Sequence, residues 1–472
     1  MKRNTQAALE DEHGRSTGYT PKVRVTERYR IIGFISSGTY GRVYKAISRV
    51  GPNGSGVAAM KTSSGTVSSA NAGGAEVAIK KFKPDKEGEQ ITYTGISQSA
   101  IREMSLCTEL SHANVIRLVE ILLEDKCIFM VFEYAEHDLL QIIHHHTQQP
   151  RHPIPPTAIK SIMFQLLNGC QYLHTNWVLH RDLKPANIMV TSAGEVKIGD
   201  LGLARRFDKP LHSLFSGDKV VVTIWYRAPE LILGSYHYTP AIDMWAVGCI
   251  FAELLSLRPI FKGEEAKMDS KKMVPFQRNQ MQKIVETMGM PTKDRWPLLP
   301  SMPEYHQLST LQPMLPGNSG SSHHGGQQQQ HHHHHHSHGH HGPHPHRYPT
   351  TSVLEKWYQN TVSNNSGAGT AANAPNGAPA LASLGQEGYR LLSGLLEYDP
   401  VKRLTAAAAL QTPFFSTGDR VSVNAFEGLR TEYPPRRVSQ DDNDIRAGSL
   451  PGTKRTGVQD DTLLRQAKRV KE

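Results

Sequence analysis

One short segment constrains the fold of this 472-residue chain more than any other, because it groups several side chains suited to phosphate chemistry. It reads His180-Arg181-Asp182-Leu183-Lys184-Pro185-Ala186-Asn187, and the motif Asp200-Leu201-Gly202 follows it. Phosphoryl transfer to an alcohol needs a carboxylate that deprotonates the hydroxyl and oxygen ligands that hold magnesium against a nucleotide. Asp182 can be the base, and Lys184 a cation beside the transferring group. Asn187 and Asp200 can bind the metal, so the fold must bring both motifs together.

A glycine-containing segment lies upstream, between two predicted strands. It runs Ile35-Ser36-Ser37-Gly38-Thr39-Tyr40-Gly41-Arg42-Val43. Glycines let backbone amides approach phosphates without interference from side chains. A hairpin turn explains the same glycines equally well, so this segment becomes informative only together with the other motifs.

Lys80 ends the strand-like run Val77-Ala78-Ile79-Lys80, and a helix is predicted over about 97–110. A lysine at a strand end is ordinarily just solvated. Here a partner is available, because Glu103 lies on the predicted helix. A strand lysine paired with a helix glutamate holds the α- and β-phosphates of ATP in kinases, so we predict this pair.

The composition predicts one packed region diluted by polar segments, since hydrophobic residues make up 38% of the chain. The net charge of +10 is too small for this length to indicate nucleic-acid binding. The four cysteines form no Cys-x-x-Cys pair, which favours reduced, buried thiols over disulfides or zinc. Residues 1–30 contain no apolar core of the kind that a signal peptide needs. No apolar run reaches the length of about 18 residues that a membrane span needs. We therefore expect a soluble intracellular protein.

The pattern along the chain predicts an N-terminal extension over 1–27, one domain over 28–416 and a polar, disordered tail with a basic end over 417–472. Flexible insertions interrupt the domain at about 51–75, 316–347 and 363–380. The second insertion contains six consecutive histidines. It could bind metal, but no carboxylate or cysteine framework defines a geometry, and we favour a disordered insertion.

These motifs resemble those of protein kinases, and Ser97-Gln98-Ser99-Ala100-Ile101-Arg102-Glu103 is similar to the cyclin-reading helix of the cyclin-dependent kinases. The other matching segments are Phe132-Glu133-Tyr134-Ala135 with Asp138, Val221-Val222-Thr223-Ile224-Trp225-Tyr226-Arg227-Ala228-Pro229-Glu230, Asp243-Met244-Trp245-Ala246-Val247-Gly248-Cys249 and Asp399-Pro400-Val401-Lys402-Arg403. The resemblance implies an α+β, bilobal kinase fold. A small antiparallel sheet with one helix forms the N-lobe, the larger C-lobe is mostly helical, and ATP binds between them.

The resemblance also implies the cofactors ATP and Mg²⁺ and assigns nucleotide-binding residues. The glycine-rich segment and Lys80 would contact the phosphates, and Asp182 would be the proton acceptor. The adenine and ribose would be held by Phe132, Glu133, Ala135 and Asp138. Ser36 departs from the family, which usually has glycine at the first position of this loop.

Within the family, the chain most resembles the fungal form of the Mediator-associated kinase that pairs with cyclin C. The helix motif begins Ser-Gln-Ser, and the metal-binding triplet is Asp-Leu-Gly rather than Asp-Phe-Gly. Asp218 lies where most relatives carry an activating phosphothreonine. The tail from Asp441 to Arg455 is also similar to that group.

The resemblance implies that three arginines converge on Asp218, namely Arg102, Arg181 and Arg205. A phosphate carries about −1.5 to −2 charges, whereas a carboxylate carries −1, so Asp218 is a partial substitute. Two hypotheses follow: no separate activating kinase is needed here, and an acidic side chain of a partner subunit supplies the missing charge. The alternative is that Asp218 is simply a solvated loop residue. Ser213 and Ser216 lie nearby in the sequence and are alternative residues for phosphorylation.

Val221, Val222 and Arg227 would form a pocket that favours proline directly after the target hydroxyl, because proline has no N–H to leave unsatisfied there. Thr223 is expected to tether the catalytic loop. Glu230 and Arg403 are expected to form a structural ion pair.

We therefore predict a nuclear serine/threonine kinase, cyclin-dependent and part of the Mediator kinase module. Its substrates would be Ser/Thr-Pro sites in the RNA polymerase II C-terminal repeat and in transcription factors, with no direct nucleic-acid or membrane binding. The basic end, residues 467–472, is either a solvated tail or a nuclear-import signal. The alternative function is a kinase-fold scaffold that holds a cyclin. A mitogen-activated kinase is disfavoured, since the activation segment lacks Thr-x-Tyr.

Overall fold

The computed structural model describes residues 24–37, 41–49, 74–82, 98–124, 127–148, 151–207, 223–237, 239–266, 275–311, 348–364 and 381–440. They divide into two compact units. Unit 1 takes its described residues from Met1–Ala100, Leu118–Tyr134 and Arg437–Glu472, and unit 2 from Ile101–Arg117 and Ala135–Arg436. Unit 1 is built on an antiparallel sheet and unit 2 is mostly helical, which confirms the predicted α+β, two-lobed class. In the described part, no helix is both long and apolar enough to span a bilayer.

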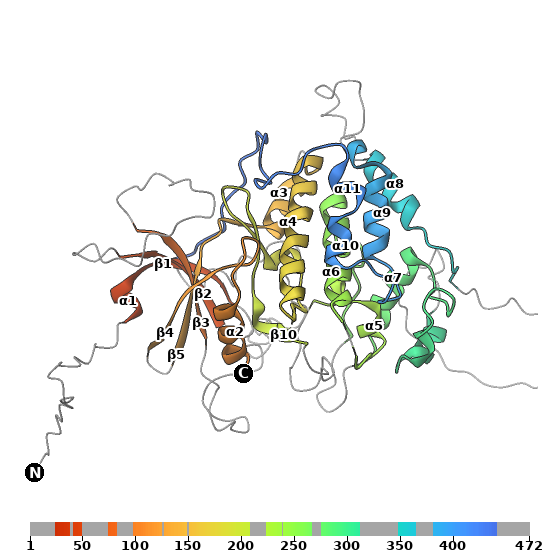
Figure 1. The fold of residues 1–472 in the computed structure, drawn as a ribbon, viewed down its shortest axis with the longest axis horizontal. Coiled ribbons are helices and arrows are strands. Elements are labelled where there is room, and N and C mark those ends of the chain that lie inside the picture. The colour runs from red at the N-terminus through yellow and green to blue at the C-terminus, as the bar shows by residue number, and fades with distance from the viewer. Residues whose placement is uncertain are drawn as a thin grey trace, which may run out of the picture. The chain divides into compact units, whose positions relative to one another are not determined.

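Unit 1 contains a five-stranded antiparallel sheet in the order β1-β2-β3-β5-β4 (Figure 1). Its elements are helix α1 (Val25–Arg28) and strands β1 (Tyr29–Ser37), β2 (Gly41–Ser48), β3 (Glu76–Phe82), β4 (Leu118–Glu124) and β5 (Cys127–Glu133). The period of two in β3 buries Val77 and Ile79 on one face. These side chains join a core that includes Val25, Tyr29, Ala46 and Val131.

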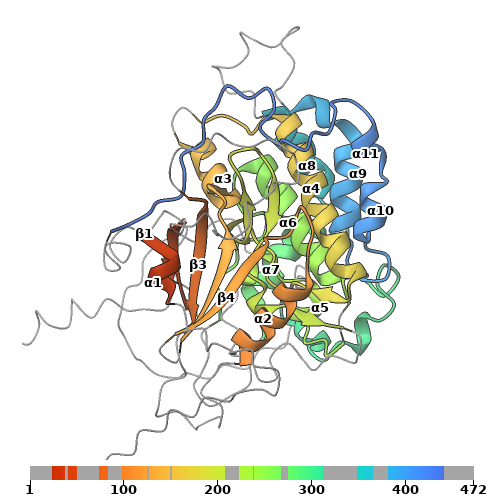
Figure 2. The same cartoon turned by 60° about the vertical axis from the view of Figure 1, so that its left-hand side comes forward.

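Unit 2 is built around two long helices that pack against each other, α4 (Pro156–Thr175) and α6 (Ala241–Ser256) (Figure 2). Helix α4 begins with proline at its first position, where the missing N–H is not needed. Helix α6 is buried along its whole length, as expected for a helix that is apolar all round. The other helices are α2 (Gln98–Glu109, mostly in unit 2), α3 (Leu139–Thr147), α5 (Pro229–Ile232), α7 (Arg278–Met288), α8 (Leu354–Asn364), α9 (Gly385–Leu395), α10 (Ala406–Leu410) and α11 (Pro413–Ser416).

Short strands of unit 2 carry the catalytic motifs. Strands β6 (His137–Asp138), β8 (Ile188–Val190) and β9 (Val196–Ile198) form one antiparallel sheet, and β7 (Val178–Leu179) pairs with β10 (Arg205–Arg206). The His180–Asn187 segment therefore runs from β7 to β8, and Asp200 follows β9. The four cysteines are free, and three of them are buried.

The predicted insertions lie almost wholly outside the described residues. The exceptions are Gly74 and Ala75 before β3 and Ser363 and Asn364 at the end of α8. Residues 1–23 of the predicted N-terminal extension also lie outside the described residues. The last residues of the predicted extension belong to helix α1, which begins at Val25.

The tail differs from the sequence-based expectation of disorder from residue 417 on, because residues 417–440 make specific contacts. Ala425, Tyr433 and Ser439 are buried. The buried side chains of Lys160 and Gln165 on α4 bind backbone carbonyls of this segment. Long-range hydrogen bonds therefore order a polar sequence that has little apolar surface of its own.

The predicted ion pair between Glu230 and Arg403 is confirmed. Arg403 donates two parallel hydrogen bonds to the Glu230 carboxylate, at 2.7 and 3.0 Å, and both side chains are buried. Arg403 also donates to the backbone carbonyl of Ala241, at 2.8 Å. The pair thus connects α5 with the start of α6.

We predict that Glu230→Gln lowers the free energy of unfolding by about 3 kcal/mol, because it leaves the Arg403 guanidinium buried without a counter-charge. Chemical denaturation measures the change. The control is Glu286→Gln, which breaks the half-exposed pair with Lys283 and should change stability by less than about 1 kcal/mol. Equal effects of the two substitutions would contradict this account.

Candidate active site

The structure brings three predicted catalytic residues together in the loop between β7 and β8. The Lys184 ammonium lies 2.8 Å from Asp182 Oδ2. The Asn187 amide nitrogen donates to the backbone carbonyl of Asp182 at 2.8 Å and to its Oδ2 at 3.0 Å. Asp182 and Asn187 are buried among polar partners. The Asp182 carboxylate is therefore fixed in orientation by two neighbouring donors.

Asp243 on α6 holds this loop in place. Its carboxylate accepts backbone N–H groups of His180 and Arg181, each at 2.9 Å, and a ring nitrogen of His174 lies 3.0 Å away. Arg181 has a φ of +67°, which a residue with a side chain rarely adopts. Burial raises the pKa of Asp243, but hydrogen bonds and charges from His174 and His180 outweigh it and hold the pKa below its ordinary value.

Asp200 is connected to the same loop through the backbone. The N–H of Gly199 donates to the carbonyl of Asn187 at 2.9 Å, so Asp200 directly follows a residue bound to Asn187. Asp200 is exposed and has a φ of +57°. The amide nitrogen of Asn187 faces Asp182, which leaves its oxygen as the atom suited to a cation.

This donor set fits magnesium. Mg²⁺ usually binds through one or two side-chain oxygens together with substrate phosphates, rather than through a complete protein cage. In the described ranges, no group of three or more His, Cys, Asp and Glu side chains could hold a metal. Asn187 and Asp200 would therefore hold Mg²⁺ jointly with the phosphates of a nucleotide.

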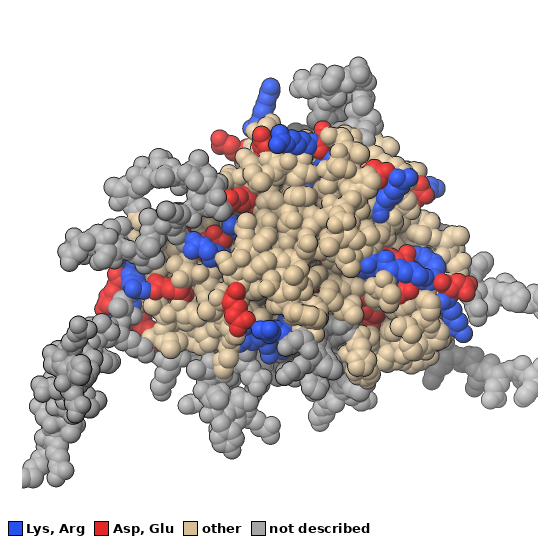
Figure 3. Space-filling view, in the orientation of Figure 1, with Lys and Arg blue, Asp and Glu red and all other residues tan. Residues whose placement is uncertain are grey.

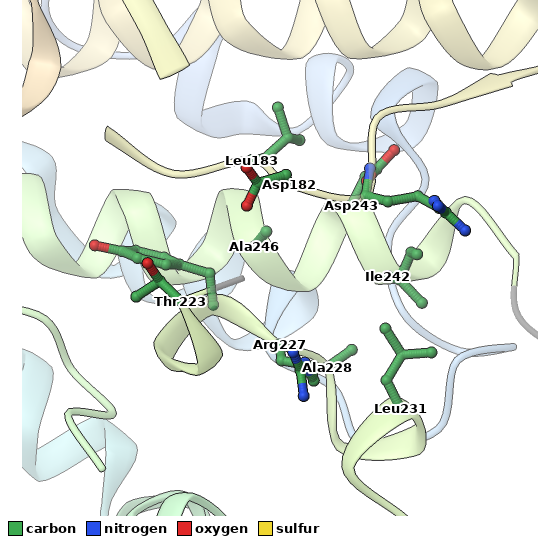
Figure 4. Close-up of a pocket in the computed structure, with 11 residues that line it drawn as sticks. Asp182, Leu183, Thr223, Arg227, Ala228, Leu231, Ile242, Asp243 and Ala246 are labelled. Atoms are coloured by element: carbon green, nitrogen blue, oxygen red, sulfur yellow. The ribbon is translucent and has the colours of Figure 1, made fainter. Parts of the chain in front are cut away.

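A pocket lies beside the catalytic loop in unit 2. Figure 4 shows Asp182, Thr223 and Arg227 around it, with Ile242 and Ala246 of α6 in its wall. Burial lowers the pKa of Arg227 to about 10, and the carboxylates of Glu265 and Asp182 oppose this change. Thr223 and Asp182 share the pocket, but their predicted tether stays a prediction.

Glu253 supports the turn that lines this pocket, and sequence reasoning did not single it out. Tyr226, in the 3₁₀ turn Ile224–Tyr226, donates its hydroxyl to Glu253 Oε2 at 2.6 Å. Burial raises the pKa of Glu253 to about 7, although Tyr226 and Lys262 both act to lower it. A buried carboxylate beneath the activation segment has no local sequence signature.

The glycine-rich segment is a hairpin of unit 1, as far as it is described. Ile35, Ser36 and Ser37 lie on β1, and Gly41, Arg42 and Val43 lie on β2. Ser37 pairs with Arg42, and Val43 pairs with Lys80 on β3. A Cβ on Gly41 would lie 2.3 Å from the carbonyl oxygen of Lys81, so close strand packing by itself requires this glycine. Gly38, Thr39 and Tyr40 lie outside the described residues.

The predicted Lys80–Glu103 pair takes one residue from each unit, and it stays a prediction. Lys80 lies in the middle of β3, and Glu103 on α2 is almost fully buried. The predicted adenine-binding residues are also distributed over both units, since Phe132 and Glu133 belong to unit 1 and Ala135 belongs to unit 2. Their role likewise stays a prediction.

Asp138, the predicted ribose-binding residue, has two partners within unit 2. Its Oδ1 accepts the backbone N–H of Gln141 at 2.9 Å and caps α3. Its Oδ2 lies 3.5 Å from Nε of Arg436. Burial raises the pKa of Asp138, and Arg436 opposes this. Sequence reasoning missed Arg436, because it expected disorder in this part of the chain.

The activation segment is only partly described. Asp218, Val221 and Val222 lie outside the described residues. Arg181 donates to the carbonyl of Leu203 at 2.8 Å, and Arg205 to that of Ala204 at 3.3 Å. Among the described residues, Nη1 of Arg102 is buried without a hydrogen-bond acceptor. Convergence of the three arginines on Asp218 therefore stays a prediction.

We predict that Glu253 makes folding stability depend on pH. Its pKa is about 7 in the folded state, against an ordinary value of 4.5, so the folded state holds more protons between these values. Stability should therefore fall by about 3 kcal/mol as the pH rises from 4.5 to 7.5. Denaturation at several pH values should show this loss in the wild type but not in Glu253→Gln, which keeps an acceptor for Tyr226. Parallel pH profiles for the two proteins would contradict the assignment.

Residues 61–415 match the family described as protein kinase domain. The chain is 75% identical over 462 residues to serine/threonine-protein kinase SSN3 of Gibberella moniliformis, which covers 98% of this chain and 95% of the relative. It is 71% identical to SSN3 of Chaetomium globosum, over 97% of this chain and 82% of the relative. Ssn3 of Aspergillus niger is 62% identical, over 97% of this chain and 94% of the relative.

Proposed function

Because this chain belongs to the protein kinase family, among the fungal serine/threonine kinases named SSN3, we propose that it is a cyclin-dependent kinase of the Mediator kinase module. It would phosphorylate Ser-Pro and Thr-Pro sites in the RNA polymerase II C-terminal repeat and in transcription factors. The observation that carries the catalytic part is the fixed group of Asp182, Lys184 and Asn187 beside a pocket.

The geometry supports in-line phosphoryl transfer. Asp182 orients the substrate hydroxyl and accepts its proton, while the hydroxyl oxygen bonds to the γ-phosphorus. The bond from the γ-phosphorus to the bridging oxygen breaks, and ADP leaves. Lys184 stabilises charge on the transferring group. Mg²⁺, when bound, neutralises phosphate charge, and Asn187 with Asp200 would hold it.

The pocket beside Asp182 supports a proline-directed substrate. Arg227 is buried in its wall, and Ala228 and Leu231 add apolar surface. Such a lining suits a ring that carries no N–H donor.

Helix α2 supports the proposal of cyclin binding, because Ile101 within its motif is 46% exposed. A large apolar side chain on an exposed helix face is suited to a protein partner. The Nη1 atom of Arg102 is buried without a hydrogen-bond acceptor among the described residues, which supports the proposal that an anion binds there. We propose that Asp218 supplies part of this charge and that an acidic partner side chain supplies the rest.

We propose a nuclear location and no direct nucleic-acid binding. On the face in Figure 3, basic and acidic side chains of the described residues lie interspersed in small groups. The basic residues 467–472 and the pair Lys454-Arg455, proposed as import signals, lie outside the described residues.

We predict that Asp182→Asn lowers kcat for a Ser-Pro heptad peptide by at least about a hundredfold, since the base is lost. The assay uses the full chain with a C-type cyclin and Mg-ATP. Asp294→Asn, at an exposed turn, is the control and should be fully active. If Asp182→Asn keeps its activity, the proposed role is wrong. If the wild-type assembly is inactive but still binds cyclin, the scaffold function is favoured.

We predict that Asp218→Ala lowers kcat/KM about tenfold, because the arginines lose a charge-assisted hydrogen-bond acceptor. Peptide phosphorylation by the kinase–cyclin pair measures this, with Asp294→Ala as the control. Activity equal to wild type would refute the role of Asp218. If the pair is already as active as the full assembly, no partner supplies a further charge.

A further inference from the structure

One face of the unit 1 sheet carries the predicted nucleotide-binding residues of its central strands. Val43 on β2 lies directly opposite Lys80 on β3. In the next row of the same face, Lys45 lies opposite Ala78, and Ala78 lies opposite Phe132 on β5. Side chains alternate between the two faces along a strand, and opposite residues share a face. Lys45 therefore lies on the nucleotide face of the sheet, although sequence reasoning did not single it out.

Tyr134 lies where the regular pairing of β5 ends. The last pair between β3 and β5 joins Val77 and Glu133, and Tyr134 follows β5 outside any strand. Its side chain is nevertheless buried. The ladder hydrogen bonds that fix β5 do not extend to Tyr134, so contacts of its side chain become important for its position.

Lys45 provides such a contact. Its Nζ lies 4.3 Å from the centroid of the Tyr134 ring. A cation within about 6 Å of an aromatic ring is attracted to the ring face. The same ammonium lies 2.7 Å from Oε1 of Glu76, the first residue of β3. Glu76 therefore holds the cation in place over the ring.

The surroundings of Lys45 keep its side chain charged. Burial lowers the pKa of Lys45, but a hydrogen bond to Glu76 and interactions with Tyr134 and Glu76 outweigh it and raise the pKa above its ordinary value. The Lys45 side chain is only 18% exposed. A cation–aromatic contact is stronger when it is partly shielded from water.

The same sheet contains a second lysine–aromatic pair that serves as a comparison. Lys81 on β3 lies opposite Phe129 on β5, and its Nζ lies 5.4 Å from the centroid of the Phe129 ring. Lys81 directly follows Lys80 in the strand, so it lies on the other face of the sheet. Both pairs contribute a similar interaction to the sheet, but only the Lys45 pair contacts the segment next to the predicted adenine-binding residues.

We propose that Lys45 is a positioning residue for the nucleotide. Its ammonium, held by Glu76, fixes the Tyr134 ring and with it the backbone of the adjoining residues Glu133 and Ala135, which are proposed to hold adenine. The inference rests on the proposed kinase function and on that proposed adenine site. A binding segment that is already ordered loses less conformational freedom when the ligand binds, so the contact favours nucleotide affinity.

The test measures nucleotide binding and turnover in the full kinase–cyclin assembly. Lys45→Met should raise the Kd for Mg-ADP and the KM for ATP about fivefold, with kcat and the KM for peptide unchanged. Lys45→Arg should restore both constants to near the wild-type values, because a guanidinium also binds over an aromatic ring. Lys81→Met is the matched control and should leave the Kd for Mg-ADP unchanged.

A double-mutant cycle tests whether Lys45 acts through Tyr134. Tyr134→Leu removes the ring and should raise the Kd for Mg-ADP, and adding Lys45→Met should then have little further effect. Hydrogen exchange without nucleotide provides a second measurement. Exchange at the amides of Tyr134 and Ala135 should be about fivefold faster in Lys45→Met than in the wild type or in Lys81→Met.

An unchanged Kd for Mg-ADP in Lys45→Met overturns the proposal. An equal increase in Lys81→Met also overturns it, because the effect would then be a general weakening of the sheet. Additive effects of Lys45→Met and Tyr134→Leu would show that Lys45 does not act through the ring. Binding of Mg-ADP needs no phosphoryl transfer, so these results are separate from the Asp182→Asn test of the proposed kinase function.

Discussion

The carboxylate of Asp243 is the contact on which the active site depends. It is buried at the start of α6 and accepts the N–H groups of two consecutive catalytic-loop residues. Arg181 would not keep its positive φ without such an anchor, since the left-handed region is unfavourable for a residue with a side chain. The helix N-terminus favours the negative charge of Asp243. A helix that forms the core of unit 2 thus determines where Asp182 points.

The same helix supports the pocket beside the catalytic loop. Glu253 near its C-terminal end binds Tyr226, and Arg403 binds both Glu230 and the first residue of the helix. These buried polar contacts lie on either side of the turn that carries Arg227. Because they are buried, each would be costly to break by removing one partner. The residues that line the pocket are therefore held in place by buried hydrogen bonds and an ion pair within an apolar core.

Much of the candidate site could be predicted from the sequence, because the residues proposed to do the chemistry are close neighbours in it. Asp182, Lys184 and Asn187 lie within one loop, and their contacts follow from local geometry. Three supporting residues could not be predicted in this way: Asp243, Glu253 and Arg436 act from positions far along the chain. A polar segment such as 417–440 reads as disordered by composition, since its order comes from side chains of α4 and from turns elsewhere.

The sequence by itself determined the protein kinase family and, through that resemblance, the division into a sheet-based part and a mostly helical part, because the motifs that carry the resemblance are short and local. Only the tertiary structure decided which carboxylate holds the catalytic loop, which buried acid lies under the activation segment and where the C-terminal segment 417–440 runs. These features depend on contacts between distant residues, and a contact of that kind leaves no pattern in the local sequence. Burial also changes the chemistry of a group, as it does for Glu253, and burial is a property of the folded chain.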